Sequence, residues 1–150
     1  MRFLVTGAGG CIGAWTVKLL LERGFEVVCF DLAADTARLS LISDSSSWSG
    51  LKLEQGSIED TVRVKDLVRQ EGISHIIHLA AVLMPFCQAN PVAGGMVNVI
   101  GTLNIFEAAR DAGRPVRVVY ASSSAVWGPE DAYSLDRPLT EKDPTLPRTH

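Results

Sequence analysis

Short apolar runs alternate with longer stretches of helical periodicity along this 150-residue chain. The runs that predict strands are residues 3–5, 25–30, 51–55, 73–79 and 116–121. The stretches that predict helices are residues 11–23, 36–42, 57–72 and 90–110. Continuous apolar runs are typical of strands covered on both faces, and strands that alternate with helices imply right-handed βαβ units. The pattern therefore predicts an α/β fold with a doubly wound parallel sheet of at least five strands.

Residues that favour helix ends support these boundaries. Ser57 followed by Asp60 resembles a capping box, which makes Ser57 the expected N-cap of the third helix. Asn90 and Pro91 form a good N-cap and first-turn pair for the fourth helix. Glycines that suit the position just after a helix lie at Gly24, Gly72 and Gly113.

The last part of the chain differs in composition from the rest. After Gly128 it is polar, with four prolines, and no further element is predicted there. We therefore expect a folded domain at residues 1–128 and a proline-rich loop at residues 129–150.

A glycine-rich turn joins the first predicted strand to the first predicted helix. Gly7, Gly10 and Gly13 follow the spacing G-x-x-G-x-x-G, whereas the fingerprint G-x-G-x-x-G would need glycine at Ile12. Glycines let a pyrophosphate approach the backbone, and the helix N-terminus behind them supplies free N–H groups and a positive dipole end. Taken alone, the glycines also suit a purely structural turn.

Asp31 ends the second predicted strand, 18 residues beyond Gly13. In a dinucleotide-binding fold a carboxylate at this position accepts hydrogen bonds from the adenosine ribose and repels a 2′-phosphate. NAD is therefore expected as the cofactor in preference to NADP. The alternative for Asp31 is an ordinary turn residue, and Arg38 is expected to be a solvated helix charge rather than a phosphate ligand.

The fourth predicted strand ends in His78 and Leu79, followed by the small residues Ala80 and Ala81. Small side chains leave room for a cofactor across the carboxyl edge of the sheet, where open α/β folds bind ligands. His75 and His78 lie three residues apart on a strand and are expected to point to opposite faces. No metal site is therefore predicted.

Three serines follow the fifth predicted strand, at residues 122–124. Hydroxyl groups at the end of a central strand are placed to hydrogen-bond a substrate carbonyl or alcohol, although a polar loop start would have the same composition. No G-x-S-x-G elbow is present, so a serine hydrolase is not predicted.

Composition excludes several other classes of function. The net charge is −3, so no basic footprint for nucleic acid or an acidic membrane surface is expected. No apolar run is expected to be long enough for a membrane span, and the N-terminus lacks a secretory pattern. Three widely spaced cysteines predict reduced, buried thiols in a cytoplasmic protein.

Six motifs in register resemble the N-terminal part of an extended short-chain dehydrogenase/reductase of the NAD-dependent epimerase/dehydratase type. They are Thr6-Gly7-x-x-Gly10-x-x-Gly13, Asp31, Gly56-x-Ile58, His78-Leu79-Ala80-Ala81, Asn98-Val99-x-Gly101-Thr102 and Ser122-Ser123-x-x-Val126-x-Gly128. The resemblance implies a Rossmann-type sheet, here expected to stop after about five strands.

The resemblance also implies roles for particular residues. The pyrophosphate is expected at Gly7, Gly10, Cys11, Ile12 and Gly13. The ribose is expected at Asp31 and Leu32, the adenine at Ser57 and Ile58, and the path to the nicotinamide along Leu79, Ala80 and Ala81. Asn98 matches a position that supports the cofactor site, and the active-site hydroxyl falls on Ser123, with Ser124 as its alternative.

The sequence departs from the family pattern at three points. Ser57 stands where the family usually has Asp, and Trp127 where it usually has Tyr. The catalytic Tyr-x-x-x-Lys is absent, because Tyr133 is followed by Arg137 and is expected to be a loop tyrosine. Without that pair proton transfer has no agent, so we expect a truncated chain, without the catalytic helix and substrate domain, that does not turn over.

The resemblance implies an oxidoreductase or isomerase whose full-length form acts by hydride transfer on a sugar, a sugar acid or a nucleotide sugar. A non-catalytic dinucleotide-binding sensor or interaction module is the main alternative, and a domain for another phosphate ligand is a third. Relatives dimerise through the helix at residues 90–110 and the helix that carries Tyr-x-x-x-Lys. A homodimer is therefore expected to be weakened, with an apolar face at Val97, Ile100 and Ile105 left uncovered.

Overall fold

The computed structural model describes residues 1–33, 35–133 and 137–147. The chain divides into two compact units, one of residues 1–120 and one of residues 121–150.

The first unit contains a five-stranded sheet with the order β3-β2-β1-β4-β5, in which every pairing is parallel. The strands are β1 (Arg2–Thr6), β2 (Glu26–Asp31), β3 (Leu51–Gln55), β4 (His75–His78) and β5 (Arg117–Tyr120). Thr6 is level with Phe30 on one side and with His78 on the other. The strand order reverses between β1 and β4, and in open α/β sheets this switch point is where ligands bind. The predicted sheet is confirmed.

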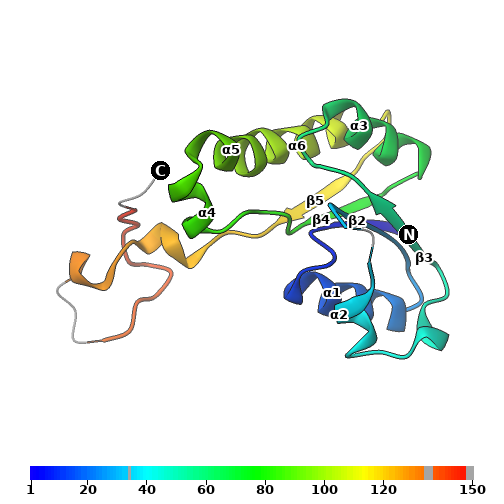
Figure 1. Cartoon of the computed structure of the whole chain (residues 1–150), viewed down its shortest axis with the longest axis horizontal. Helices are drawn as coiled ribbons and strands as arrows, with labels where there is room; N and C mark the ends of the chain where they lie inside the picture. Colours follow the sequence, from blue (N-terminus) through cyan, green and yellow to red (C-terminus); the bar gives the residue numbers. More distant parts are fainter. Residues whose placement is uncertain (34, 134–136, 148–150) are drawn as a thin grey trace. The chain divides into compact units, whose positions relative to one another are not determined.

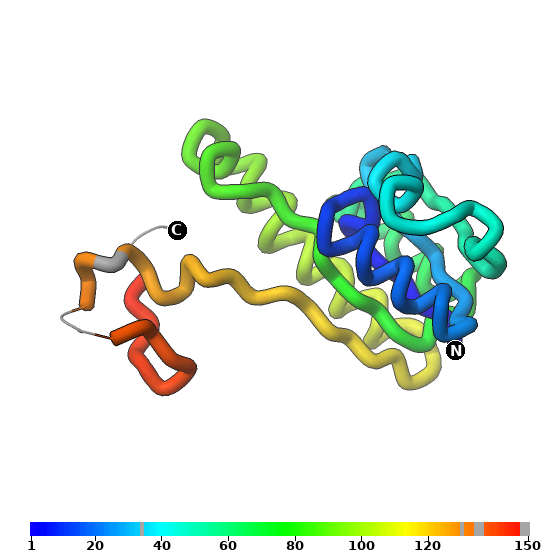
Figure 2. The backbone as a smooth tube through the Cα atoms, turned by 90° about the horizontal axis from the view of Figure 1, so that it is seen from below, coloured from blue at the N-terminus to red at the C-terminus, as the bar shows by residue number. Residues whose placement is uncertain are grey.

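Helices cover both faces of the sheet (Figure 1). Helices α1 (Cys11–Glu22) and α2 (Ala37–Ser40) lie on one face. Helix α3 (Thr61–Gln70) and a long helical segment lie on the other; that segment consists of α5 (Pro91–Gly95), a π-helical turn η2 (Met96–Gly101) and α6 (Thr102–Arg110). Figure 2 shows the long segment as one unbroken coil. A short helix that the sequence did not predict, α4 (Met84–Ala89), precedes it.

Successive residues of β1 belong to two separate cores, as the period-two geometry of a strand requires. Leu4 packs with Val28 and Ile105 in the core beneath α3 and α6. Val5 packs with Val17 and Cys29 in the core beneath α1. Burial on both faces explains why the central strands read as continuous apolar runs.

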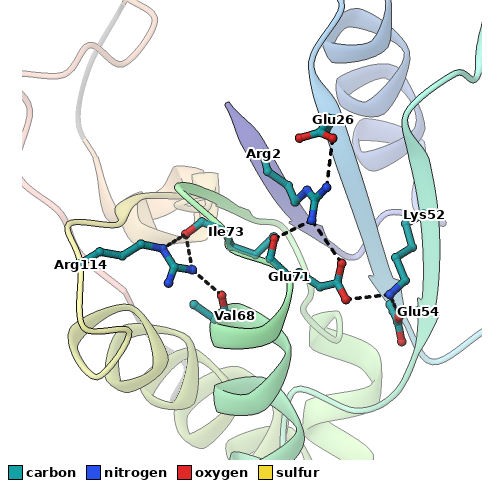
Figure 3. A network of polar contacts seen from close by, with 8 residues as sticks. All are labelled: Arg2, Glu26, Lys52, Glu54, Val68, Glu71, Ile73 and Arg114. Carbon is teal, nitrogen blue, oxygen red and sulfur yellow. Dashed lines mark hydrogen bonds and ion pairs between the residues drawn. The ribbon is translucent and has the colours of Figure 1, made fainter.

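Polar contacts join the elements where the strands begin, at the edge opposite the switch point (Figure 3). Arg2 pairs with Glu26 at 3.0 Å and donates to the carbonyl of Glu71 at 2.9 Å. Lys52 bridges Glu71 and Glu54 at 2.7 and 2.8 Å.

Arg114 supports the same edge of the sheet in another way. Its guanidinium donates to the carbonyls of Val68 at 2.8 Å and Ile73 at 3.2 Å, which fixes the turn between α3 and β4. These contacts act on the fold, because they lie away from the carboxyl ends of the strands.

The predicted N-cap of α3 was wrong. Asp60 is the N-cap, and its carboxylate accepts the amide of Arg63 at 2.9 Å. Ser57 lies in a turn before the helix, where its hydroxyl accepts the amide of Glu59 at 3.1 Å and donates to the Glu59 carboxylate at 2.9 Å. Asp is as good an N-cap as Ser, and the local serine turn decides which of them takes the position.

Two compositional expectations also need correction. The segment Pro91–Arg110 is long and apolar enough to cross a membrane by length and composition alone, with 28% of its most apolar window buried. Core helices of soluble proteins meet the same criterion, and α6 buries Asn104, Ile105 and Ala108. Cys29 is buried as expected, whereas Cys11 is exposed.

The second unit contains two 3₁₀ turns, η3 (Ser124–Trp127) and η4 (Glu130–Ala132). The phenol of Tyr133 lies 2.5 Å from the carbonyl oxygen of Trp127 and 2.7 Å from that of Pro144. Tyr133 thus has a structural role as a loop residue.

Arg137 forms two hydrogen bonds with the Asp143 carboxylate, and this ion pair lowers the pKa of the Asp143 carboxyl.

Candidate functional site

A cavity of about 390 Å³ opens at the carboxyl ends of β1, β2 and β4, at the switch point of the sheet. Most of the predicted cofactor-binding residues line it, namely Gly7, Gly10, Asp31, Leu32, Ser57, Ile58, Leu79, Ala80 and Ala81. Segments far apart in sequence thus meet around one space.

The glycines of the turn differ in what they leave room for. Gly7 has a φ of +69°, and a Cβ there would lie 2.7 Å from the amide of Ala80. A Cβ on Gly13 would lie 2.2 Å from the Gly7 carbonyl oxygen, so both positions require glycine for close packing within the protein. A Cβ on Gly10 would meet the same oxygen at 3.1 Å, which a small shift relieves. Packing within the protein therefore requires glycine at positions 7 and 13 more strictly than at position 10.

Helix α1 begins directly behind the turn, with Gly10 as its N-cap and no side chain hydrogen-bonded there. The amides of Cys11, Ile12 and Gly13 are in the first turn and have no carbonyl four residues earlier in the helix. Ile12 is 68% exposed. This helix start suits an anion, because its first turn carries no acidic residue and offers free N–H groups at the positive end of the helix dipole.

Asp31 connects the end of β2 to the glycine turn. Its Oδ2 accepts the Gly9 amide at 2.9 Å, and its Oδ1 accepts the Leu32 amide at 2.7 Å. The Leu32 carbonyl in turn accepts the side-chain amide of Gln55 at 2.9 Å. A carboxylate offers about four acceptor sites, so Asp31 can still accept hydroxyl groups from the cavity.

A buried chain of hydrogen bonds fixes the end of β4. The Thr6 hydroxyl lies 2.6 Å from His78 Nδ1, His78 Nε2 lies 3.0 Å from the Thr102 hydroxyl, and that hydroxyl donates to the Asn98 carbonyl at 2.8 Å. Because Thr102 uses its proton on Asn98, it accepts from Nε2–H, and Nδ1 accepts from Thr6. Burial lowers the pKa of His78 and so favours the neutral imidazole that these hydrogen bonds require.

Asn98 supports the cavity wall from behind. Its Nδ2 donates to the Val82 carbonyl and its Oδ1 accepts the Val82 amide, both at 2.9 Å. Val82 lines the cavity, whereas Asn98 does not. The side chain therefore reaches the site only through the backbone that it holds.

Asn104 likewise supports the part of the cavity wall formed by Ile58, by hydrogen bonds to its backbone. Its Nδ2 donates to the carbonyls of Ile58 at 2.9 Å and Glu59 at 3.1 Å, and its Oδ1 accepts the Thr61 hydroxyl at 2.9 Å. The side chain of Ile58 packs where a Cβ on Gly101 would stand. One long helical segment thus positions two walls of the cavity.

Sequence reasoning missed several lining residues, namely Gly9, Phe30, Ala33, Asp35, Arg38, Val82 and Val97. Gly9 carried a signal, since it is a fourth glycine in the turn. Arg38 was expected to be a solvated charge; it is exposed, but its Nη1 donates to the Gly9 carbonyl at 2.8 Å and it lines the cavity. Arg38 is therefore an exposed helix charge, as expected, whereas its contact with the Gly9 carbonyl was not predicted.

The predicted catalytic serines lie in the second unit. Ser123 is the N-cap of η3, where its hydroxyl accepts the Ala125 amide at 3.2 Å, and Ser124 is the first residue of that turn. Both are exposed. Their role in catalysis stays a prediction.

The described residues contain no group of three or more His, Cys, Asp or Glu side chains placed to hold a metal ion. His75 hydrogen-bonds to Ser74 at 2.9 Å and stacks on Phe3, whereas His78 bonds to Thr6 and Thr102. The two imidazoles therefore have separate surroundings.

The cavity and the fold together define a Rossmann-type domain with a ligand site at its switch point. A family model described as GDP-mannose 4,6 dehydratase matches residues 4–150. The chain belongs to this family, one of NAD-dependent epimerases and dehydratases.

Particular relatives show the breadth of the family. UDP-glucuronate 4-epimerase 3 of Arabidopsis thaliana is 31% identical over 95% of this chain and 33% of its own length. The UDP-glucose 4-epimerase of Thermus thermophilus, solved with NAD, superposes with a TM-score of 0.79 at 30% identity, over 99% of this chain and 45% of that one. DesIV is the dTDP-glucose 4,6-dehydratase of Streptomyces venezuelae, solved with NAD and TYD. It superposes with a TM-score of 0.77 at 31% identity, over 98% of this chain and 46% of that one. The chain spans less than half the length of each.

Proposed function

We propose that this chain binds NAD and forms the cofactor-binding part of an enzyme that epimerises, dehydrates or oxidises a sugar nucleotide. The observation that carries the proposal is the cavity at the switch point, where the glycine turn, Asp31 and residues 57–58 and 79–81 meet. Two structural neighbours solved with NAD, one an epimerase and one a dehydratase, support it.

The residues present fit an NAD molecule. The amides at the start of α1 would hold the pyrophosphate, and the space beside them is open because Gly10 has no Cβ. Asp31 would accept the ribose hydroxyls, while Ser57 and Ile58 would border the adenine. The small residues Ala80 and Ala81 would leave space toward the nicotinamide. When bound, NAD supplies an acceptor that takes a hydride from a carbinol carbon and can return it.

Ser123 is proposed as the hydroxyl that hydrogen-bonds the substrate oxygen, with Ser124 as its alternative. Moving the proton of a carbinol needs a base whose pKa is lowered by a nearby cation. The 150 residues contain no tyrosine followed four positions later by lysine. We therefore propose that these residues alone bind NAD without turnover.

The absence of Tyr-x-x-x-Lys from these residues favours a second candidate, a dinucleotide-binding sensor or interaction module. Such a module needs the cavity but has no need of Ser123. Both candidates predict that these residues alone form no NADH, which is tested by loading the chain with NAD, adding a UDP-sugar and following NADH absorbance. Formation of NADH that Ser123→Ala abolishes would establish catalysis and contradict the proposal that these residues alone do not turn over.

Two further properties remain proposals. A homodimer that uses the long helical segment, weakened as the resemblance implies, is proposed because Ile100, Val99 and Leu103 on it are 38%, 57% and 51% exposed. Ile105 was expected on the same uncovered face, but this was wrong, because its side chain is buried in the core beneath α3 and α6. Sedimentation velocity measures that state directly. A cytoplasmic location is proposed from the free thiols, of which Cys29 is buried.

NAD binding is tested by titrating the chain with NADH and following its fluorescence. We expect saturable binding that Gly10→Val abolishes, because the added methyl groups fill the space that the pyrophosphate needs. Gly95→Val is the matched control, since a Cβ there meets nothing within 4 Å and its φ of −64° suits any residue. If Gly10→Val folds and binds NADH as well as the unmodified chain, the pyrophosphate assignment is wrong.

A further inference from the structure

The hydroxyl of Thr6, at the carboxyl end of β1, has every hydrogen-bonding position occupied. The amides of Leu79 and Ala80 both donate to it at 3.3 Å, and it lies 2.6 Å from His78 Nδ1. A hydroxyl has two acceptor lone pairs and one proton. Because the two amides occupy the lone pairs, the proton of Thr6 goes to Nδ1, and this nitrogen must itself carry none.

The other nitrogen of the imidazole requires the same tautomer. Nε2–H donates to the Thr102 hydroxyl at 3.0 Å, and that hydroxyl donates to the Asn98 carbonyl at 2.8 Å. The side chain of Asn98 then holds both backbone groups of Val82, a residue of the cavity wall. The neutral imidazole of His78 thus lies between two contacts to this wall, one at each ring nitrogen.

A second proton on His78 conflicts with this arrangement. An imidazolium donates from both nitrogens, so Nδ1–H would face the Thr6 proton, and both lone pairs of that hydroxyl are already occupied. Either the imidazole or the backbone of residues 79–80 must then move. Ala80 lines the cavity, and its nitrogen would lie only 2.7 Å from a Cβ on Gly7. Protonation of His78 therefore disturbs the wall beside the glycine turn.

We propose that His78 is a positioning residue for the cofactor, whose neutral imidazole holds the backbone of residues 79–82 in the geometry that accepts NAD. This inference rests on the proposed function. NAD binding and protonation of His78 then oppose each other. By linkage, a proton on His78 weakens NAD binding by the same factor by which NAD weakens the binding of that proton.

The side chains that face His78 come from the three elements packed against it. They are Thr6 from β1, Thr102 from α6 and Tyr120, which is level with His78 on β5 and whose ring contacts Phe106 of α6. Of the three, the phenol is the titratable group, and none is a carboxylate that would stabilise an imidazolium. Burial lowers the pKa of His78 below its usual 6.5, so NAD affinity should be constant above neutral pH and fall as the pH drops through the pKa of the NAD-free chain.

The alternative is that His78 only joins β1 and β4 to the long helical segment. A purely structural role would change the free energy of unfolding, and it would leave the affinity of the folded chain for NAD independent of pH. The two roles therefore differ in a readout other than stability.

The test is a calorimetric titration with NAD at about pH 7.5 and about pH 5.5. One proton changes an affinity by at most tenfold per pH unit below its pKa, so we expect roughly 2- to 10-fold weaker binding at the lower pH. His78→Leu, which leaves Thr6 without its acceptor, should weaken binding at both pH values. His78→Asn, whose Oδ1 can stand in for Nδ1 and cannot take up a proton, should restore part of that affinity and remove the dependence on pH.

His75 provides the matched control. It hydrogen-bonds to Ser74 and stacks on Phe3, away from the relay, so His75→Asn should keep the pH dependence of the unmodified chain. A second measurement needs no variant: NMR titration of the two imidazoles with and without NAD. NAD should lower the pKa of His78 and leave the titration of His75 unchanged.

The outcomes separate this inference from the proposed function. Equal NAD affinity at the two pH values, or a titration of His78 that NAD does not move, overturns the inference, while NAD binding by the chain still stands. If the unmodified chain does not bind NAD at about pH 7.5, both fail. Circular dichroism at each pH checks that the unmodified chain and the variants are folded.

Discussion

The Gly9 amide donates to Asp31 Oδ2 at 2.9 Å, so the predicted ribose ligand and the predicted pyrophosphate turn form one hydrogen-bonded unit. A Cβ on Gly9 would lie 3.2 Å from the same carboxylate oxygen. If NAD binds as proposed, binding of its ribose would be coupled to the geometry of the pyrophosphate turn. The effects of substitutions in the turn are therefore measured on both stability and NAD affinity.

Gly7→Ala should lower stability more than Gly24→Ala does. Both glycines have left-handed backbones, with φ of +69° and +73°, and this alone costs about 1 to 2 kcal/mol for alanine. At Gly24 the added Cβ meets nothing, whereas at Gly7 it would lie 2.7 Å from Ala80 N. Overpacking adds about 1 to 3 kcal/mol. Urea unfolding measures the difference, and equal costs would contradict the close approach of the turn to β4.

Asn98→Ala should lower the free energy of unfolding by about 2 kcal/mol, because it removes two hydrogen bonds to Val82 at about 1 kcal/mol each. It should also weaken NAD binding, since Val82 lines the cavity. Asn90→Ala is the control, because Asn90 makes no side-chain cap bond at the start of its helix, and its cost should stay within about 0.5 kcal/mol. Full NAD affinity in Asn98→Ala would mean that Val82 is not part of the site.

Stability should fall as the pH drops below about 6.5, the ordinary pKa of histidine. Burial lowers the pKa of His78, so between its folded pKa and 6.5 the unfolded chain binds a proton that the folded chain does not. Urea midpoints at about pH 7.5 and about pH 5.5 measure this loss. His78→Gln, which cannot charge, should show a smaller loss. An identical loss in the variant would place the titrating group elsewhere.

Cys11 should react with a thiol reagent in the folded chain, and Cys29 only after unfolding. Burial, with a smaller contribution from Asp31, raises the pKa of the Cys29 thiol to about 12, whereas Cys11 is exposed at the start of α1. NAD should slow the labelling of Cys11, which lies where the pyrophosphate is proposed. Cys11→Ser should remove the fast phase of thiol labelling, which assigns that phase to Cys11. Fast labelling of Cys29 in the folded chain would contradict its burial.

The sequence predicted the elements that local patterning controls. Continuous apolar runs located the strands because both faces of the sheet are covered, and the glycine spacing located the turn because Gly7 and Gly13 are sterically required. It did not predict the N-cap of α3, since Ser57 and Asp60 suit that position equally and the turn at Glu59 decides between them.

Long-range contacts explain what else was missed. Arg38 reaches Gly9 across 29 positions and Asn104 reaches Ile58 across 46, and neither contact has a local signature. Helix α4 lacks a side-chain cap and has few residues, so it left no periodicity to read. The strand ends that line the cavity and the supporting position of Asn98 were therefore predictable, whereas the contacts of Arg38 and Asn104 were not.

The most direct test of NAD binding at the switch point is the change in backbone amide NMR signals when NAD is added. We expect the largest shifts at Gly9, Cys11, Ile12 and Ala80, and none at Arg114, which lies at the opposite edge of the sheet. Shifts confined to other surfaces, or none at saturating NAD, would contradict it.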